Sequence, residues 1–95
     1  MILKEMERLE LYNIGLPGQE VYPKAKVPTY RSRMIDSLVY KGLIVENPDF
    51  DRTKPWFGQK AYLLTPAGEE VWPTIQEAAL KTIERFRKRK QEGTY

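Results

Sequence analysis

The segment LVYKGLIVE, residues 38–46, contains the junction that decides the fold. Before Gly42, apolar residues recur at helical spacing, and after it Leu43, Ile44 and Val45 form a continuous apolar run typical of a short strand. Glycine adopts the left-handed conformation that closes a helix at little steric cost. The segment therefore predicts a helix that ends just before the glycine and turns directly into a strand, which holds that strand rigidly beside the helix.

The N-terminal segment predicts an amphipathic helix. Within residues 2–13, Ile2, Met6 and Leu9 share one helical face, and charged side chains occupy the other. Asn13 and a nearby glycine supply a stop signal. We expect the face that carries Ile2 to point toward the core.

Prolines divide the next segment into two helices. A proline is tolerated in the first turn of a helix, because its missing N–H would be unpaired there anyway. With Pro23 and Pro28 as boundaries, we expect a short helix over residues 18–25 and a longer one over residues 29–41. Either Pro28 begins the longer helix or Thr29 is its N-cap.

Downstream of the junction we expect a β-hairpin and a long helix. Residues 43–46 and 61–64 have the pattern of two short strands, and strands so close in sequence most simply pair antiparallel around a polar loop. Thr65 and Pro66 then supply an N-cap and a first-turn proline for the last helix. That helix meets Pro73, where we expect a kink.

The composition excludes several classes of function. The chain has 95 residues, the size of one domain, and contains neither cysteine nor histidine. It therefore lacks thiolate chemistry and the commonest metal ligand and general base, so we expect no enzyme, no cofactor and no metal. No run is long and apolar enough to span a membrane. The absence of cysteine fits a cytoplasmic location.

Positive charge is concentrated in two segments. Residues 21–45 carry five lysines or arginines against Asp36 alone, for a balance of +4, on a chain whose net charge is +3. RFRKRK, residues 85–90, holds five positive charges among six residues. Such clusters suggest a polyanionic partner. RFRKRK is also explained as a solvated helix end favoured by the helix dipole.

Three stretches follow one another in a familiar order. EVYPKAKVPTYRSRMIDSL is similar to a helix-turn-helix; SLVYKGLIV then supplies a turn, and YLLTPAGEEVWP supplies a helix start after a polar loop. Together they resemble the winged-helix DNA-binding proteins of the MarR, PadR and HxlR type over about residues 18–75. The residues that match the pattern of these families are Leu38, Lys41, Gly42, Leu43, Ile44, Leu64, Thr65, Gly68 and Pro73.

The resemblance implies an α+β, mostly helical winged helix-turn-helix, formed as a single domain over residues 1–95. It implies a homodimer that binds double-stranded DNA and regulates transcription. Residues 29–41 would be the recognition helix in the major groove. Residues 47–60 would be the wing, on the DNA backbone or in the minor groove.

The candidate DNA contacts are hydroxyls and cations near the recognition helix and wing. Arg33 is the best candidate for a bidentate contact to guanine, and the hydroxyls are better suited to phosphates. The alternative for the same face is an ordinary solvated helix surface. The residues expected to contact DNA are Lys24, Lys26, Thr29, Arg31, Ser32, Arg33, Ser37, Tyr40, Arg52, Lys54 and Lys60.

Several side chains in this set allow two interpretations. Arg31 lies toward the core side of its helix, so a phosphate contact and a structural ion pair both fit. Asp36 would repel phosphates, unless it binds Arg33 or accepts a hydrogen bond from cytosine. Trp56 and Phe57 would either cover the small core of the hairpin or stack on bases, the first being favoured.

The last helix extends beyond what one small domain can cover. Residues 74–91 would span roughly 27 Å at about 1.5 Å per residue. By default its apolar stripe is core. Because related proteins dimerise through terminal helices, we expect residues 74–92 to contribute to a dimer interface and the helix to end at Gly93. The interface candidates are Ile75, Ala79, Leu80, Ile83 and Phe86.

The sequence leaves two other functions open. Winged helices also serve as protein-interaction modules, in which the face over residues 29–40 would carry a protein partner. A single-strand or RNA binder would instead use exposed aromatic side chains as stacking platforms. The candidates for that role are Tyr30, Tyr40, Trp56 and Phe57.

Overall fold

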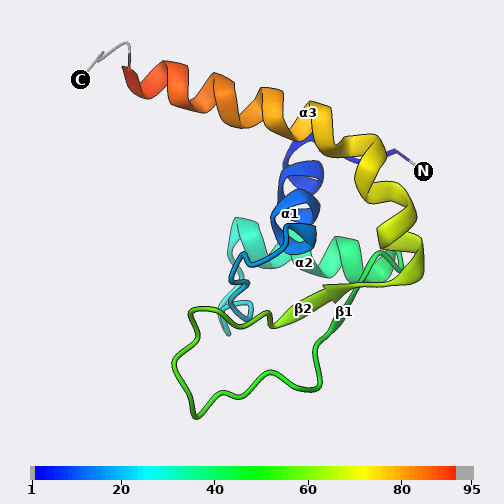
Figure 1. Cartoon of the computed structure of the whole chain (residues 1–95), viewed down its shortest axis with the longest axis vertical. Helices are drawn as coiled ribbons and strands as arrows, with labels where there is room; N and C mark the ends of the chain where they lie inside the picture. Colours follow the sequence, from blue (N-terminus) through cyan, green and yellow to red (C-terminus); the bar gives the residue numbers. More distant parts are fainter. Residues whose placement is uncertain (1, 92–95) are drawn as a thin grey trace.

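Three helices and a two-stranded hairpin make up the part of the chain that the structure, a computed structural model, describes, residues 2–91 (Figure 1). Their order is α1 (Glu5–Gly15), α2 (Tyr30–Tyr40), β1 (Ile44–Glu46), β2 (Tyr62–Leu64) and α3 (Pro66–Gln91). The expected α+β, mostly helical class is confirmed. The expected end of the last helix at Gly93, and residue 92 of the expected interface, lie outside the described residues.

The helix-to-strand junction forms as predicted. Gly42 has a φ of +74°, in the left-handed region, and its N–H donates to the carbonyl oxygen of Val39 at 2.9 Å. The next N–H, from Leu43, donates to Leu38 at 3.0 Å. β1 then pairs antiparallel with β2, with Ile44 opposite Leu64. The first strand begins one residue later than expected because Leu43 is part of the turn.

The prediction of a short helix over residues 18–25 is wrong, because this segment is extended. Val21 forms a parallel bridge with Lys60, in which its N–H donates to Gln59 at 2.9 Å and its carbonyl oxygen accepts from Ala61 at 2.7 Å. Pro23 explains the difference, since a proline disfavours helical geometry in the residue before it. Val21 is buried in the core, and a helix would have removed its bonds to the hairpin.

The core lies where α1 meets α2, α3 and the hairpin (Figure 1). The face of α1 that packs inward carries Glu7, Leu11 and Ile14, and the expected inward residue Ile2 is 91% exposed. The apolar pattern misled here because Glu7, a charged residue, occupies a position of the buried stripe. Tyr12 on the same helix stacks on Trp72 of α3, with ring centroids 5.5 Å apart.

The start of α3 is capped as predicted, by Thr65. Its Oγ1 accepts from the N–H of Gly68 at 3.1 Å, and its own N–H donates to Leu43 at 3.0 Å. A Cβ at Gly68 would lie 2.0 Å from the carbonyl oxygen of Leu43, so only glycine allows this close approach. Pro73 lies inside α3 without ending it, and Figure 1 shows the helix axis changing direction near the yellow part that contains this residue.

Candidate nucleic-acid interface

The N-terminal end of α2 is closed by a reciprocal cap. Ser32 donates its N–H to Oγ1 of Thr29 at 3.0 Å, and Thr29 donates its N–H to Oγ of Ser32 at 2.7 Å. Ser32 is 5% exposed. The expectation that Ser32 contacts DNA is therefore wrong, because its buried hydroxyl accepts a hydrogen bond from the N–H of Thr29. Thr29 is exposed, although its hydroxyl serves the cap.

The C-terminal end of α2 is held by a buried carboxylate of α1. Oε2 of Glu7 accepts from Oγ of Ser37 and from Nζ of Lys41, both at 2.6 Å, and Oε1 accepts from the N–H of Lys4 at 3.0 Å. Burial raises the pKa of Glu7, but the hydrogen bonds from Lys41, Ser37 and Lys4 outweigh it and lower the pKa to about 2. Ser37 was expected to contact DNA, and this is also corrected, because it faces α1.

The opposite side of α2 is open to solvent. Tyr30 is 60% exposed and Tyr40 is 92% exposed. Arg33 is also exposed, and within residues 2–91 it forms no ion pair. Arg33 and Tyr40 therefore lie on the outward side of the helix, which the expected contacts with DNA require. Tyr30, Arg33 and Tyr40 together form the outward face of α2.

The cations before α2 differ in their partners. Lys24 forms an ion pair with Asp36 of α2, and this hydrogen bond raises the pKa of Lys24. Asp36 is thus engaged by Lys24 and not by Arg33. Lys26 is exposed two residues further on. Both lysines were expected to contact phosphates. Lys24 is paired with Asp36, whereas Lys26 forms no ion pair within residues 2–91.

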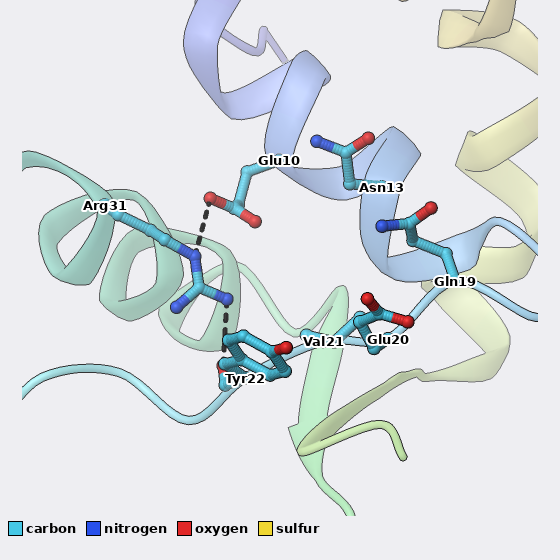
Figure 2. A pocket seen from close by; sticks show the side chains of 7 residues that line it. All are labelled: Glu10, Asn13, Gln19, Glu20, Val21, Tyr22 and Arg31. Carbon is cyan, nitrogen blue, oxygen red and sulfur yellow. Dashed lines mark hydrogen bonds and ion pairs between the residues drawn. The ribbon is translucent and has the colours of Figure 1, made fainter. Parts of the chain in front are cut away.

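Arg31 is the structural ion pair that the sequence allowed. Its Nε lies 3.3 Å from Oε1 of Glu10 on α1, and its Nη2 donates to the carbonyl oxygen of Tyr22 at 2.9 Å (Figure 2). Burial raises the pKa of Glu10, and the Arg31 guanidinium only partly counteracts this. Arg31 therefore joins α1, the extended segment and α2 as a structural ion pair, and its contact with DNA stays a prediction.

Lys60 at the base of the expected wing has turned inward. Its Nζ donates to the carbonyl oxygens of Ile14 at 2.6 Å and Leu16 at 2.9 Å, at the end of α1. Burial lowers the pKa of this amine. The carbonyls at a helix C-terminus lack partners within the helix, and a lysine satisfies them well. The expectation that Lys60 contacts DNA is therefore wrong, because its amine binds the carbonyl oxygens at the end of α1.

The loop between the strands is organised by Gln59. Its carboxamide accepts from the N–H of Asp51 at 2.8 Å and donates to the carbonyl oxygens of Asp51 and Pro55, at 3.1 and 2.8 Å. Arg52 is exposed at this loop, and the exposed Lys54 has its Nζ 3.8 Å from Asp51. These two cations are available at the expected wing.

The two aromatic residues of the loop behave differently. Trp56 packs against Tyr22 and Phe50, with ring centroids 5.8 and 5.9 Å away, so it covers the loop as favoured. Phe57 is 71% exposed and does not take part in the hydrophobic core. The expectation that both would cover the small core of the hairpin fits Trp56, which is 39% exposed and covers Phe50, and does not fit Phe57.

The stripe on α3 is divided between core and surface. Ile75 is 7% exposed and Ala79 is 1% exposed, because both pack into the chain's own core, and their expected place in a dimer interface is corrected. Leu80 and Phe86 are 45% and 39% exposed, and Ile83 is partly buried. Only these last three remain available to a partner chain.

Sequence reasoning missed the two glutamates of α1 that bind α2. Glu7 lies four residues before Leu11 and seven before Ile14, which places it on their helical stripe. A charged residue on an apolar stripe indicates that it has a buried partner of opposite charge. The basic residues in and just after α2 were the candidates for that partner. The pairing itself depends on how the helices pack.

Comparison of the chain with protein-family models, with curated proteins and with solved structures found no match. Among the described residues, no helix combines the length and the apolar character needed to cross a membrane. Within the same residues, no three histidine, cysteine, aspartate or glutamate side chains come together to hold a metal ion.

Proposed function

We propose that this protein is a winged-helix transcriptional regulator that binds double-stranded DNA through the outward face of α2. The observation that carries the proposal is the unequal use of the two sides of this helix. Its inner side is tied to α1 at both ends, by Glu7 and Glu10, whereas Tyr30, Arg33 and Tyr40 point outward. A rigidly held helix with an exposed guanidinium suits the major groove.

The roles of the remaining cations follow from their exposure. Arg33 would read guanine through a bidentate contact, whereas Lys26, Arg52 and Lys54 would neutralise phosphates. The extended segment before α2 would take the place of the first helix of a helix-turn-helix. The DNA-facing surface is thus smaller than the sequence predicted, since Ser32, Ser37, Arg31 and Lys60 serve the fold.

The proposal includes a homodimer formed through α3. Leu80 and Phe86 are partly exposed on α3, and Ile83 is partly buried at the edge of the core. Figure 1 shows the C-terminal, orange-to-red part of α3 extending beyond the rest of the fold. A two-fold symmetric pair would present two copies of α2 to a palindromic site. The basic residues Arg87–Lys90 would remain as solvated charge near the end of the helix.

The decisive experiment is selection of bound duplexes from a random pool, followed by sizing of the complex. We expect a two-fold symmetric consensus and an affinity that falls steeply with salt concentration. Arg33→Ala should cost about 1 to 3 kcal/mol on the consensus and little on random DNA, and Lys26→Ala should weaken both alike. No retention of duplexes at low salt would refute the proposal.

A protein-interaction module is the second candidate, favoured by apolar residues beside α2. Val39 and Val45 are 44% and 50% exposed, and they border a hollow that also carries Asp36 and Glu46. Lys24 borders the same hollow and neutralises Asp36, whereas the carboxylate of Glu46 suits a protein partner better than DNA. Val45→Lys separates the two functions, because it should abolish docking of a protein while leaving or strengthening retention of duplex DNA.

A further inference from the structure

A hollow of about 390 Å³ lies between the N-terminal segment, α1 and the first half of α3. Its volume is in the range of small-molecule sites in proteins. Figure 1 shows the N-terminal segment passing α3 close to the place where the helix changes direction. Neither the outward face of α2 nor the proposed dimer residues of α3 line this hollow. The residues that line it are Ile2, Leu3, Arg8, Val71, Thr74 and Ile75.

The walls of the hollow are mostly aliphatic. Leu3 and Ile75 belong to the core and are each 7% exposed, and Val71 packs against the same core. Ile2 is 91% exposed at the border. The hydroxyl of Thr74 donates to the carbonyl oxygen of Val71 at 2.5 Å, so its hydrogen is already used. Such walls favour the hydrocarbon part of a ligand.

Arg8 alone is charged among the described residues that line the hollow, and its guanidinium is incompletely used. Its Nη1 donates to the carbonyl oxygen of Leu3 at 2.5 Å. Its Nε is buried and has no hydrogen-bond partner, and Arg8 forms no ion pair within residues 2–91. A buried donor of a charged group without an acceptor is unfavourable, and a ligand that supplies the acceptor removes this penalty.

The unused edge of the guanidinium matches a carboxylate. The N–H groups of a guanidinium lie in one plane, and those of Nε and Nη2 run parallel along one edge. Because Leu3 accepts from Nη1, this edge remains for the two oxygens of a carboxylate, the bidentate geometry that arginine prefers. An ammonium ligand would meet the positive charge of Arg8 and no carboxylate on the described walls.

We propose that this hollow binds a small aliphatic monocarboxylate, with its carboxylate on the Nε and Nη2 edge of Arg8 and its hydrocarbon chain against Leu3, Val71 and Ile75. The side chain of Arg8 is partly buried, and a rotation about its outer bonds turns this edge toward the hollow. Burial of the hydrocarbon chain adds affinity that an exposed ion pair lacks. The ligand contacts the N-terminal segment, α1 and α3 at once.

The test is an NMR-detected titration of the isotope-labelled full chain with sodium hexanoate, at constant pH and ionic strength. We expect saturable shifts of the backbone amide signals of Leu3, Val71 and Ile75, with one site per chain. Hexanamide has the same chain without the charge, and acetate has the charge without the chain. Each should bind more weakly by about tenfold or more.

Two pairs of variants locate the site. Arg8→Gln should weaken the affinity for hexanoate about tenfold, or about 1.4 kcal/mol, whereas Arg87→Gln removes the same charge from an exposed position on α3 and should leave it unchanged. Arg8 also supports Leu3, so the second pair avoids this contact. Ile2→Glu places a carboxylate at the exposed border, where it competes for the guanidinium, and should weaken binding far more than Ile2→Gln.

Several results would overturn the proposal: no saturable shifts with hexanoate, equal binding of hexanamide, or shifts confined to α2 and the loop between the strands. Equal affinities within either pair of variants would overturn it as well. The Ile2 pair decides the outcome if Arg8→Gln does not fold. None of these measurements requires DNA, so their outcome is independent of the function proposed above.

Discussion

The two ends of α2 are both tied to α1 by a glutamate, and the two contacts differ in kind. At the C-terminal end, Glu7 is 2% exposed and receives hydrogen bonds from Lys41, Ser37 and a backbone N–H. At the N-terminal end, Glu10 has the Arg31 guanidinium as its ion-pair partner. The pKa of Glu7 is lowered to about 2, whereas the pKa of Glu10 is raised. The number of donors, and not burial alone, decides the direction of the shift.

The largest effect is expected when the C-terminal contact is broken. Glu7→Gln leaves Lys41 without its ion-pair partner and should lower the free energy of unfolding by about 3 kcal/mol. Urea denaturation of the variant, with Glu84→Gln as an exposed control, measures the difference. If both variants lose an equally small amount of unfolding free energy, the contact of Glu7 with Lys41 and Ser37 does not hold α2 in place.

Acid should act mainly through Glu7. A group whose pKa is lower in the folded state contributes stability above its ordinary pKa, and that stability is lost as protons bind. With a folded pKa of about 2 against an ordinary 4.5, Glu7 should account for a loss of about 3 kcal/mol as the pH falls from 5 to 2.

The same titration compares the two ends directly. The raised pKa of Glu10 has the opposite sign, because protonation of this group is favoured by folding. Denaturation of the two glutamine variants across this pH range should therefore show a flatter acid response for Glu7→Gln and a steeper one for Glu10→Gln than for the parent chain. Parallel curves would contradict the comparison.

The cap at Thr29 should have a smaller effect on the N-terminal end of α2. Thr29→Ala removes the acceptor of the Ser32 N–H and should cost about 1 kcal/mol of unfolding free energy. Thr29→Ser retains the hydroxyl and is the matched variant. If Thr29→Ser lost as much unfolding free energy as Thr29→Ala, the effect would come from the methyl group of Thr29 and not from the cap.

The smallest effect is expected at the N-terminal ion pair. Arg31 and Glu10 are 38% and 15% exposed, and water screens such a pair more than the buried one. Glu10→Gln should therefore change the free energy of unfolding at neutral pH by no more than about 0.5 kcal/mol. A change as large as that of Glu7→Gln, measured in the same urea series, would mean that both contacts are equally important.

The accuracy of the sequence-based predictions depended on the range of the interactions involved. The end of α2 at Gly42 and the start of α3 at Thr65 were predicted, and Thr29 was one of two alternatives for the start of α2, since each depends on backbone conformation within a few residues. The expected helix over residues 18–25 failed. There, the pairing of Val21 with the hairpin, a contact between residues far apart in the sequence, replaced the expected helix with an extended segment.

The candidate site was predicted less completely than the fold. The outward position of Arg33 and Tyr40 followed from helical periodicity. The inward use of Ser37 and Lys60 did not, because hydroxyls and amines are compatible with both solvent and interior. Their partners lie 30 and 46 residues away along the chain, so that no spacing in the sequence indicates them.

By itself, the sequence determined the end of α2 at Gly42 and the start of α3 at Thr65, because capping and turn geometry are local. Only the tertiary structure decided which charged residues of this protein are structural. Glu7, Arg31 and Lys60 each find their partners on a different element, and the energy of a charge depends on the donors, acceptors and water that surround it in three dimensions.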